Sequence, residues 1–127
     1  MRNRKTVARA VATGACAAGL VAALQGQAWA ATVTIEASGG GGTAQFNGDT
    51  NTFRACDTAG DGWGIEARLR FPAADNKPDL VVDTRGQAAP YCTPWKGGLT
   101  EGKSYRMIVT PVVGTVRGQS IYIDVRA

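Results

Sequence analysis

The chain has 127 residues, with 14 lysines and arginines against 10 aspartates and glutamates, and it contains no histidine. Without histidine, Ser-His-Asp catalysis, Cys-His catalysis and histidine-bound metals are excluded. Glu36, Glu66 and Glu101 leave a two-carboxylate hydrolase open, but a small β-domain has little room for a deep substrate cleft, so a small hydrolase is the disfavoured alternative. We therefore expect a protein that is not an enzyme and needs no cofactor.

Residues 1–30 have the pattern of a signal peptide. Four basic residues lie within the first nine positions, an uncharged run follows at 10–24, and Ala28-Trp29-Ala30 provides the small residues of a cleavage site. A retained membrane anchor is one alternative, although a spanning helix needs about 20 apolar residues. A lipoprotein anchor on Cys16 is another. We expect cleavage near Ala30 and a secreted protein, associated in one alternative with the cell wall, with no stable membrane insertion after cleavage.

Removal of the signal peptide changes the charge of the protein. Four of the basic residues and none of the acidic residues lie in 1–30, so residues 31–127 carry 10 of each and have no net charge. The positive charge of the full chain therefore belongs to the targeting segment. It gives no support for a nucleic-acid partner or an anionic membrane.

Residues 31–127 predict a single all-β domain. The clearest strand is 63–71, where apolar residues alternate with polar ones at the period of two that is typical of a strand with one buried face. The predicted strands are 32–37, 50–56, 63–71, 80–83, 104–110 and 120–125, with weaker candidates at 43–47 and 114–117. Gly, Pro, Asn and Asp fill the segments between them and predict turns. The expected fold is a small antiparallel β-sandwich, or an open barrel, of about six to eight strands.

Two cysteines remain after residue 30, Cys56 and Cys92, and they can pair in one way. A small exported domain gains stability from such a bond, because its core is small and its compartment is oxidising. Two reactive or metal-binding thiols are the alternative, but two thiolates without histidine supply too few ligands for zinc, and the chain has no Cys-x-x-Cys redox motif. We predict a disulfide between these cysteines.

The segment 56–64, Cys-Asp-Thr-Ala-Gly-Asp-Gly-Trp-Gly, is the most distinctive in the chain. Asp57 and Asp61 match two positions of a calcium-loop template, whereas Ala59 and Arg68 stand where ligands are required. Aspartate and glycine suit tight turns equally well. We predict a turn here and no metal, with calcium at these two aspartates as the minor alternative.

The same segment also carries a resemblance. The pattern Cys56-Asp57-x-x-x-Asp61-Gly62-x-Gly64, followed by an alternating strand, Cys92 and Tyr105, resembles a group of small secreted β-domain proteins of Streptomyces and related actinobacteria. The likeness covers about residues 50–127. It departs from the group at Trp63, where a polar residue is common, and in having one cysteine pair. The resemblance implies an exported protein of a Gram-positive bacterium and no particular activity.

Two aromatic residues are the candidate binding surface. Tyr91 and Trp95 flank Cys92 in a proline-rich segment, and aromatic rings on an anchored loop often contact sugars or proteins. Packing over the disulfide is the alternative for both rings, and we expect Trp63, Phe71 and Tyr105 in the core. The first functional hypothesis is a protein-interaction or cell-envelope protein, and the second is a carbohydrate-binding module. The sequence leaves the partner, protein or glycan, and the oligomeric state open.

Overall fold

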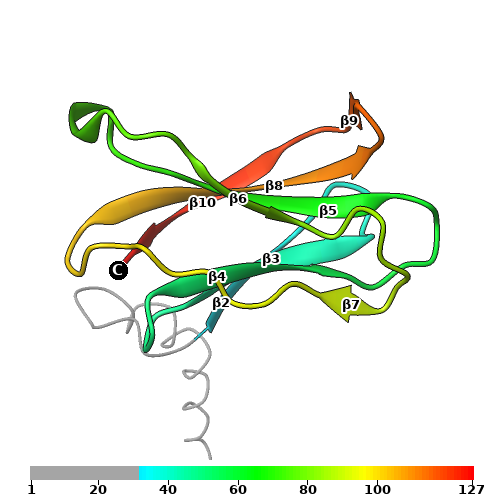
Figure 1. Ribbon diagram of the computed structural model, residues 1–127, viewed down its shortest axis with the longest axis horizontal. Helices are drawn as coiled ribbons and strands as arrows, with labels where there is room; N and C mark the ends of the chain where they lie inside the picture. Colours follow the sequence, from blue (N-terminus) through cyan, green and yellow to red (C-terminus); the bar gives the residue numbers. More distant parts are fainter. Residues whose placement is uncertain (1–31) are drawn as a thin grey trace, which may run out of the picture.

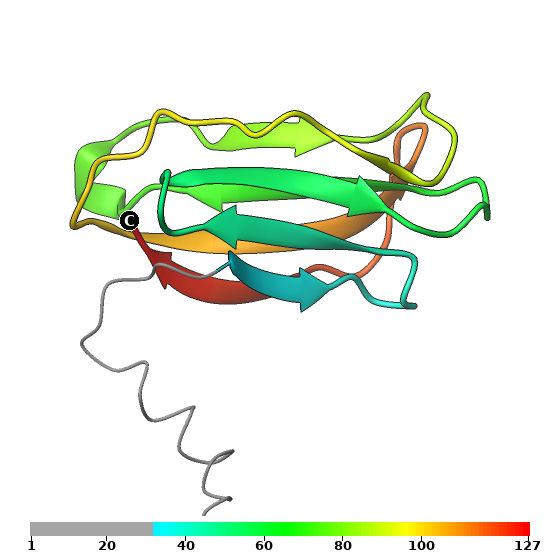
Figure 2. The same cartoon turned by 90° about the horizontal axis from the view of Figure 1, so that it is seen from below.

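The computed structural model describes residues 32–127, which form two antiparallel sheets packed face to face (Figure 1). The predicted all-β sandwich is therefore confirmed. The predicted signal peptide and its cleavage site lie outside the described residues. β2 and β10, one edge strand of each sheet, come into contact and lie side by side in Figure 2.

One sheet has four strands and the other has five. In the order β2-β3-β4-β7, the four-stranded sheet contains β2 (Thr32–Glu36), β3 (Gly42–Asn47), β4 (Thr52–Asp57) and β7 (Tyr91–Cys92). The five-stranded sheet, in the order β10-β8-β5-β6 with β9 paired to β8, contains β5 (Gly64–Arg70), β6 (Leu80–Asp83), β8 (Ser104–Val113), β9 (Val116–Arg117) and β10 (Ile121–Arg126). A turn of 3-10 helix, Ala73–Asp75, lies between β5 and β6.

Each of the eight predicted strands corresponds to an observed one, with ends that differ by up to three residues. The addition is β7, which lies within a segment predicted as loop. This two-residue strand exists because Cys92 lies opposite Cys56 and Tyr91 lies opposite Asp57. Such a pairing depends on distant parts of the chain, so local periodicity gives no sign of it.

The core lies between the sheets and is built from the inward positions of the alternating strands. Phe46 of β3 and Phe53 of β4 are paired across the sheet and fully buried, and a buried phenylalanine contributes about 1.5–3 kcal/mol. Phe71 and Tyr105 are buried as predicted, with ring centroids 5.2 Å apart in an edge-to-face arrangement. Trp63 differs from the prediction and is only half-buried, because β5 begins at Gly64 and leaves Trp63 in the preceding loop.

Candidate functional site

The segment 91–96, which carries both predicted binding aromatics, is held along β4. Cys56 and Cys92 lie directly opposite each other and form the predicted disulfide, with their Cα atoms 4.0 Å apart. Further along, Lys96 and Phe53 exchange two backbone hydrogen bonds of 2.8 and 3.0 Å. The segment is therefore an irregular edge of the four-stranded sheet and not a free loop.

Trp95 is accessible beside the outer face of the four-stranded sheet. It exposes 38% of its surface, and the guanidinium carbon of Arg54 lies 4.3 Å from its ring centroid. The Nε of Arg54 also donates to the side-chain oxygen of Gln45 at 2.8 Å. Tyr91 is half-buried and lies opposite Asp57, three positions along β4 from Arg54. The two predicted aromatics therefore do not form one continuous platform.

Four arginines gather on the outer face of the five-stranded sheet, and with Tyr122 they define what we call the arginine face: Arg68 and Arg70 of β5, Arg106 of β8, Arg117 of β9 and Tyr122 of β10. Strand register places Arg70 opposite Arg106, and the guanidinium carbon of Arg106 lies 4.0 Å from the ring centroid of Tyr122. A groove of about 440 Å³ runs between these side chains. None of these arginines is among the predicted site residues. The one local signal of the arginine face is that Arg68 and Arg70 lie two positions apart in a strand and therefore share one side of it.

Glu66 lies beneath two of these arginines. Its side chain is 3% exposed and accepts hydrogen bonds from Arg68, at 3.2 Å, and from both terminal nitrogens of Arg117. Burial raises the pKa of Glu66, but the hydrogen bond from Arg117 and the positive charge of Arg68 together outweigh burial and hold this pKa below its ordinary value of 4.5. The alternation of 63–71 predicted an exposed Glu66, which is wrong because Arg117, from β9, covers it.

Two further carboxylates pair with the arginine face. One oxygen of Asp79 accepts from both Arg68 and Arg70, each at 3.3 Å. Asp124 accepts from Arg106 at 2.9 and 3.4 Å, and this hydrogen bond lowers the pKa of Asp124. The face therefore holds four guanidinium groups against three carboxylates, which leaves it with an excess of positive charge.

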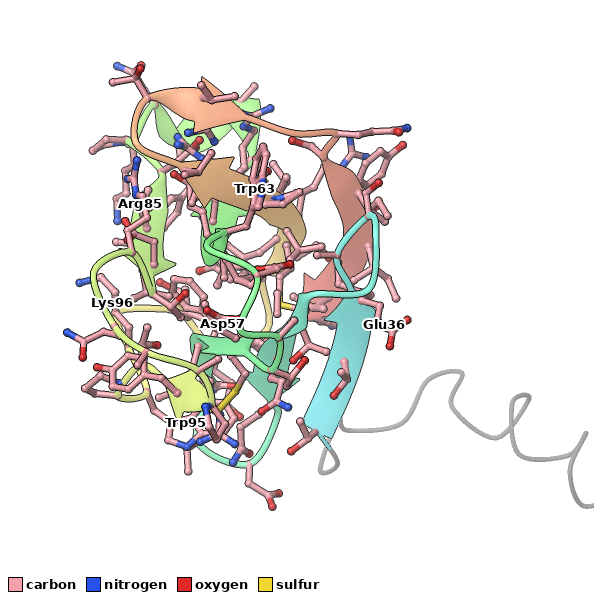
Figure 3. All side chains as sticks on the ribbon, turned by 90° about the vertical axis from the view of Figure 1, so that its right-hand side faces the viewer. Glu36, Asp57, Trp63, Arg85, Trp95 and Lys96 are labelled. Carbon is pink, nitrogen blue, oxygen red and sulfur yellow. A yellow bond between two sulfur atoms is a disulfide. The ribbon has the colours of Figure 1, made fainter. Side chains whose placement is uncertain are left out.

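A cavity of about 400 Å³ lies at one end of the sandwich, where three connections meet. They are the loop from β4 to β5, the loop from β6 to β7 and the turn from β8 to β9. Asp57, Trp63 and Arg85 line the cavity, and Figure 3 shows all three at this end of the molecule. The guanidinium of Arg85 donates to the carbonyl oxygen of Gly114 at 2.7 Å, which ties two of the connections together.

The two calcium candidates both stabilise turns. The Oδ1 atom of Asp57 accepts the backbone N–H of Ala59 at 3.2 Å, and the Oδ1 atom of Asp61 accepts the backbone N–H of Trp63 at 3.0 Å. Within residues 32–127, no three or more Cys, Asp or Glu side chains gather closely enough to hold a metal ion. The turn interpretation accounts for the placement of both aspartates, and the absence of calcium stays a prediction.

Comparisons with protein-family models, with curated proteins and with solved structures found no match to this chain. The resemblance to actinobacterial secreted proteins therefore stays a prediction. In the part of the chain that the structure describes, no helix has the length and apolar character needed to cross a membrane.

Proposed function

We propose that this chain is a secreted, non-enzymatic domain that binds a protein partner, in the cell envelope or outside it, through the arginine face. The proposal rests mainly on one observation, the gathering of four arginines and an exposed tyrosine around one groove. Arginine and tyrosine are the residue types most enriched, with tryptophan, among the side chains that dominate binding energy at protein interfaces.

The charges of this face favour an acidic partner. Arg70 is 57% exposed, and its one ion pair within residues 32–127 is with Asp79, which Arg68 shares. Most N–H donors of its guanidinium are thus available to a carboxylate from outside. Arg70 also lies directly opposite Arg106, and like charges in that position repel. An acidic side chain bound between these two arginines would relieve the repulsion.

Export and the lack of enzymatic activity have separate support. The pattern of residues 1–30 supports export, and the Cys56–Cys92 disulfide is consistent with an extracellular protein, since such bonds persist in oxidising compartments. The chain has no histidine, and each of the three carboxylates on the arginine face is bonded to arginine. These carboxylates are therefore poorly placed to act as general acids or bases.

Affinity capture with matched variants tests the proposal. Immobilised protein comprising residues 31–127 is incubated with culture medium and with envelope extract of the producing organism. We expect Arg70→Ala/Arg106→Ala to lose the proteins that the unchanged domain retains, whereas Trp95→Ala keeps them. Raising the salt to about 1 M should also release them, because the screening length falls to about 3 Å.

One result would contradict the proposal. If the double variant has the native circular dichroism spectrum and melting temperature and still retains the same proteins, the arginine face is not the binding surface. A domain that retains no protein from either fraction contradicts the proposed function as a whole.

A second candidate function is glycan binding beside the outer face of the four-stranded sheet. The exposed indole of Trp95 favours it, because Gln45 and Thr34 lie in line with Arg54 and supply uncharged polar groups of the kind that sugars contact. Retention on chitin, cellulose and peptidoglycan tests this candidate, with Trp95→Ala and Tyr91→Ala as the variants. No retention on any of the three glycans removes it.

A further inference from the structure

The cavity at the end of the sandwich is separate from both surfaces described above. Loops at the end of a β-sandwich are a frequent location of binding sites, since a rigid scaffold holds them in place. The cavity volume of about 400 Å³ lies near the lower end of the range for small-molecule sites. Its size therefore suits a small ligand, and its lining residues indicate which kind.

Asp57 is the unexpected residue in the cavity wall. It follows Phe53 and Ala55 at the core-facing positions of β4, and it is 4% exposed. A buried carboxylate costs free energy unless it is well paired. Within residues 32–127, Asp57 forms no ion pair, and its one side-chain hydrogen bond is with the backbone of Ala59. Since a carboxylate accepts about four hydrogen bonds, Asp57 retains acceptor capacity for a ligand.

Trp63 supplies an apolar wall that is held in place. Asp61 binds the backbone N–H of Trp63, and the next residue, Gly64, lies close against Arg85. A Cβ atom at Gly64 would lie 3.0 Å from the backbone nitrogen of Arg85, which is closer than most Cβ contacts, so a side chain here would displace Arg85. Trp63 is the aromatic residue in the lining of this cavity, and it also borders a second hollow together with Ile65 and Pro111. Its half-buried indole is therefore the flat apolar group available to a ligand that reaches Asp57.

The charges in the lining favour an uncharged ligand. Asp57 is negative and would repel an anion. Arg85 is positive and would oppose a cation, although its ion pair with Asp83, at 3.0 Å, moderates this effect. Gln87, also in the lining, offers an uncharged amide. The ligand that suits this set carries hydroxyl donors for Asp57 and an apolar face for Trp63, without a net charge.

We propose that this cavity binds one ring of a neutral sugar. Hydroxyl groups of the sugar donate to the carboxylate of Asp57, and its C–H face packs on the indole of Trp63. The amide of Gln87 hydrogen-bonds a further hydroxyl at the cavity mouth. This site does not depend on the arginine face, so either proposal can fail without the other. It is also distinct from Trp95, which lies beside the outer face of the other sheet.

Nuclear magnetic resonance titration of ¹⁵N-labelled protein tests the site. The ligands are glucose, galactose, mannose and N-acetylglucosamine, with putrescine and glucuronate as the cationic and anionic comparators. We expect at least one neutral sugar to cause saturable shift changes confined to residues 57–64, 84–90 and 112–115. Asp57→Asn and Trp63→Ala should each weaken binding about tenfold or more, whereas Trp95→Ala leaves it unchanged.

Each remaining outcome overturns the proposal. It is overturned if none of the four sugars saturates the protein, or if the shift changes lie elsewhere. It is also overturned if putrescine or glucuronate binds here in place of a sugar, or if both variants keep the affinity of the unchanged protein. If Asp57→Asn does not fold, the shift map of the unchanged protein and Gln87→Ala, at an exposed loop position, decide the matter. Gln87→Ala should weaken sugar binding several-fold, in line with the loss of one neutral hydrogen bond.

Discussion

On the outer face of the four-stranded sheet, the outward positions of β2 and β3 are mostly uncharged, whereas the groove on the outer face of the five-stranded sheet is lined by four arginines that pair with three carboxylates. The outward residues of β2 and β3 are Thr32, Thr34, Glu36, Thr43, Gln45 and Asn47. Both faces follow the same alternation along their strands. The contrast shows that alternation decides which side chains point outward, and that strand register decides which of them meet. Five predictions test how differently the two sheets are held.

The largest effect is expected from the disulfide, which ties β7 to the four-stranded sheet. Replacing Cys56 and Cys92 with alanine removes a cross-link between residues separated by 36 positions in sequence. The unfolded chain then has more conformational entropy, which lowers the free energy of unfolding by about 3.8 kcal/mol. Urea denaturation measures this change. Reductant should destabilise the unchanged protein and leave the double variant unaffected, and a loss below about 1 kcal/mol would contradict the prediction.

The next effect concerns Glu66, which holds the five-stranded face together. Glu66→Gln leaves Arg68 and Arg117 without their shared charged acceptor, so the free energy of unfolding should fall by about 1.5–3 kcal/mol. Glu36→Gln is the matched control, because Glu36 is exposed on β2 and forms no ion pair within residues 32–127. The control should change stability by less than about 0.5 kcal/mol. If the free energy of unfolding falls equally in the two variants, the ion pairs of Glu66 do not stabilise the protein beyond an exposed glutamate.

The ion pairs of Glu66 also predict how the stability of the protein depends on pH. The pKa of Glu66 is lower in the folded protein than its ordinary value of 4.5. The stabilisation from its ion pairs is therefore fully present above pH 4.5 and is lost as the pH falls through the folded value. The melting temperature should decrease on acidification below pH 4.5, and less steeply in Glu66→Gln. Parallel curves for the two proteins would assign the acid sensitivity to other carboxylates.

A smaller effect is expected on the four-stranded face. Arg54→Ala removes the guanidinium from the ring of Trp95 and the hydrogen bond to Gln45. The free energy of unfolding should fall by about 0.5–1 kcal/mol, which is typical of an exposed contact between a cation and an aromatic ring. Tryptophan fluorescence should change in this variant, because the environment of Trp95 changes. Arg126→Ala is the control, since Arg126 is exposed at the end of β10. If the fluorescence of the control changes as much, the fluorescence does not report the contact between Arg54 and Trp95.

The smallest expected effect is that of removing calcium. Asp57 and Asp61 bind backbone N–H groups of their own loop, so EDTA should leave the melting temperature unchanged. Differential scanning calorimetry with EDTA and with added Ca²⁺ measures this. A large decrease that Ca²⁺ reverses would contradict the turn interpretation of Asp57 and Asp61.

The sequence predicts the strands well because alternation and turn residues act locally. It fails at positions where distant segments meet. Trp63 continues the alternation of β5 but lies in the loop before it. Glu66 occupies an outward position yet is buried, because Arg117 comes from a strand 51 positions away. The neighbours of Trp95 in the chain predict a binding residue, whereas its contact with Arg54 depends on the path of segment 91–96 along β4.

Local patterns in the chain were thus enough to give the fold class, the turns and the one cysteine pair of residues 31–127. They sufficed because backbone preferences and the period of two depend on neighbouring residues. The arginine face, the burial of Glu66 and the cavity beside Asp57 required the folded molecule. Each is made by side chains from two or more strands or loops, and their contacts exist only after the sheets have aligned in one register.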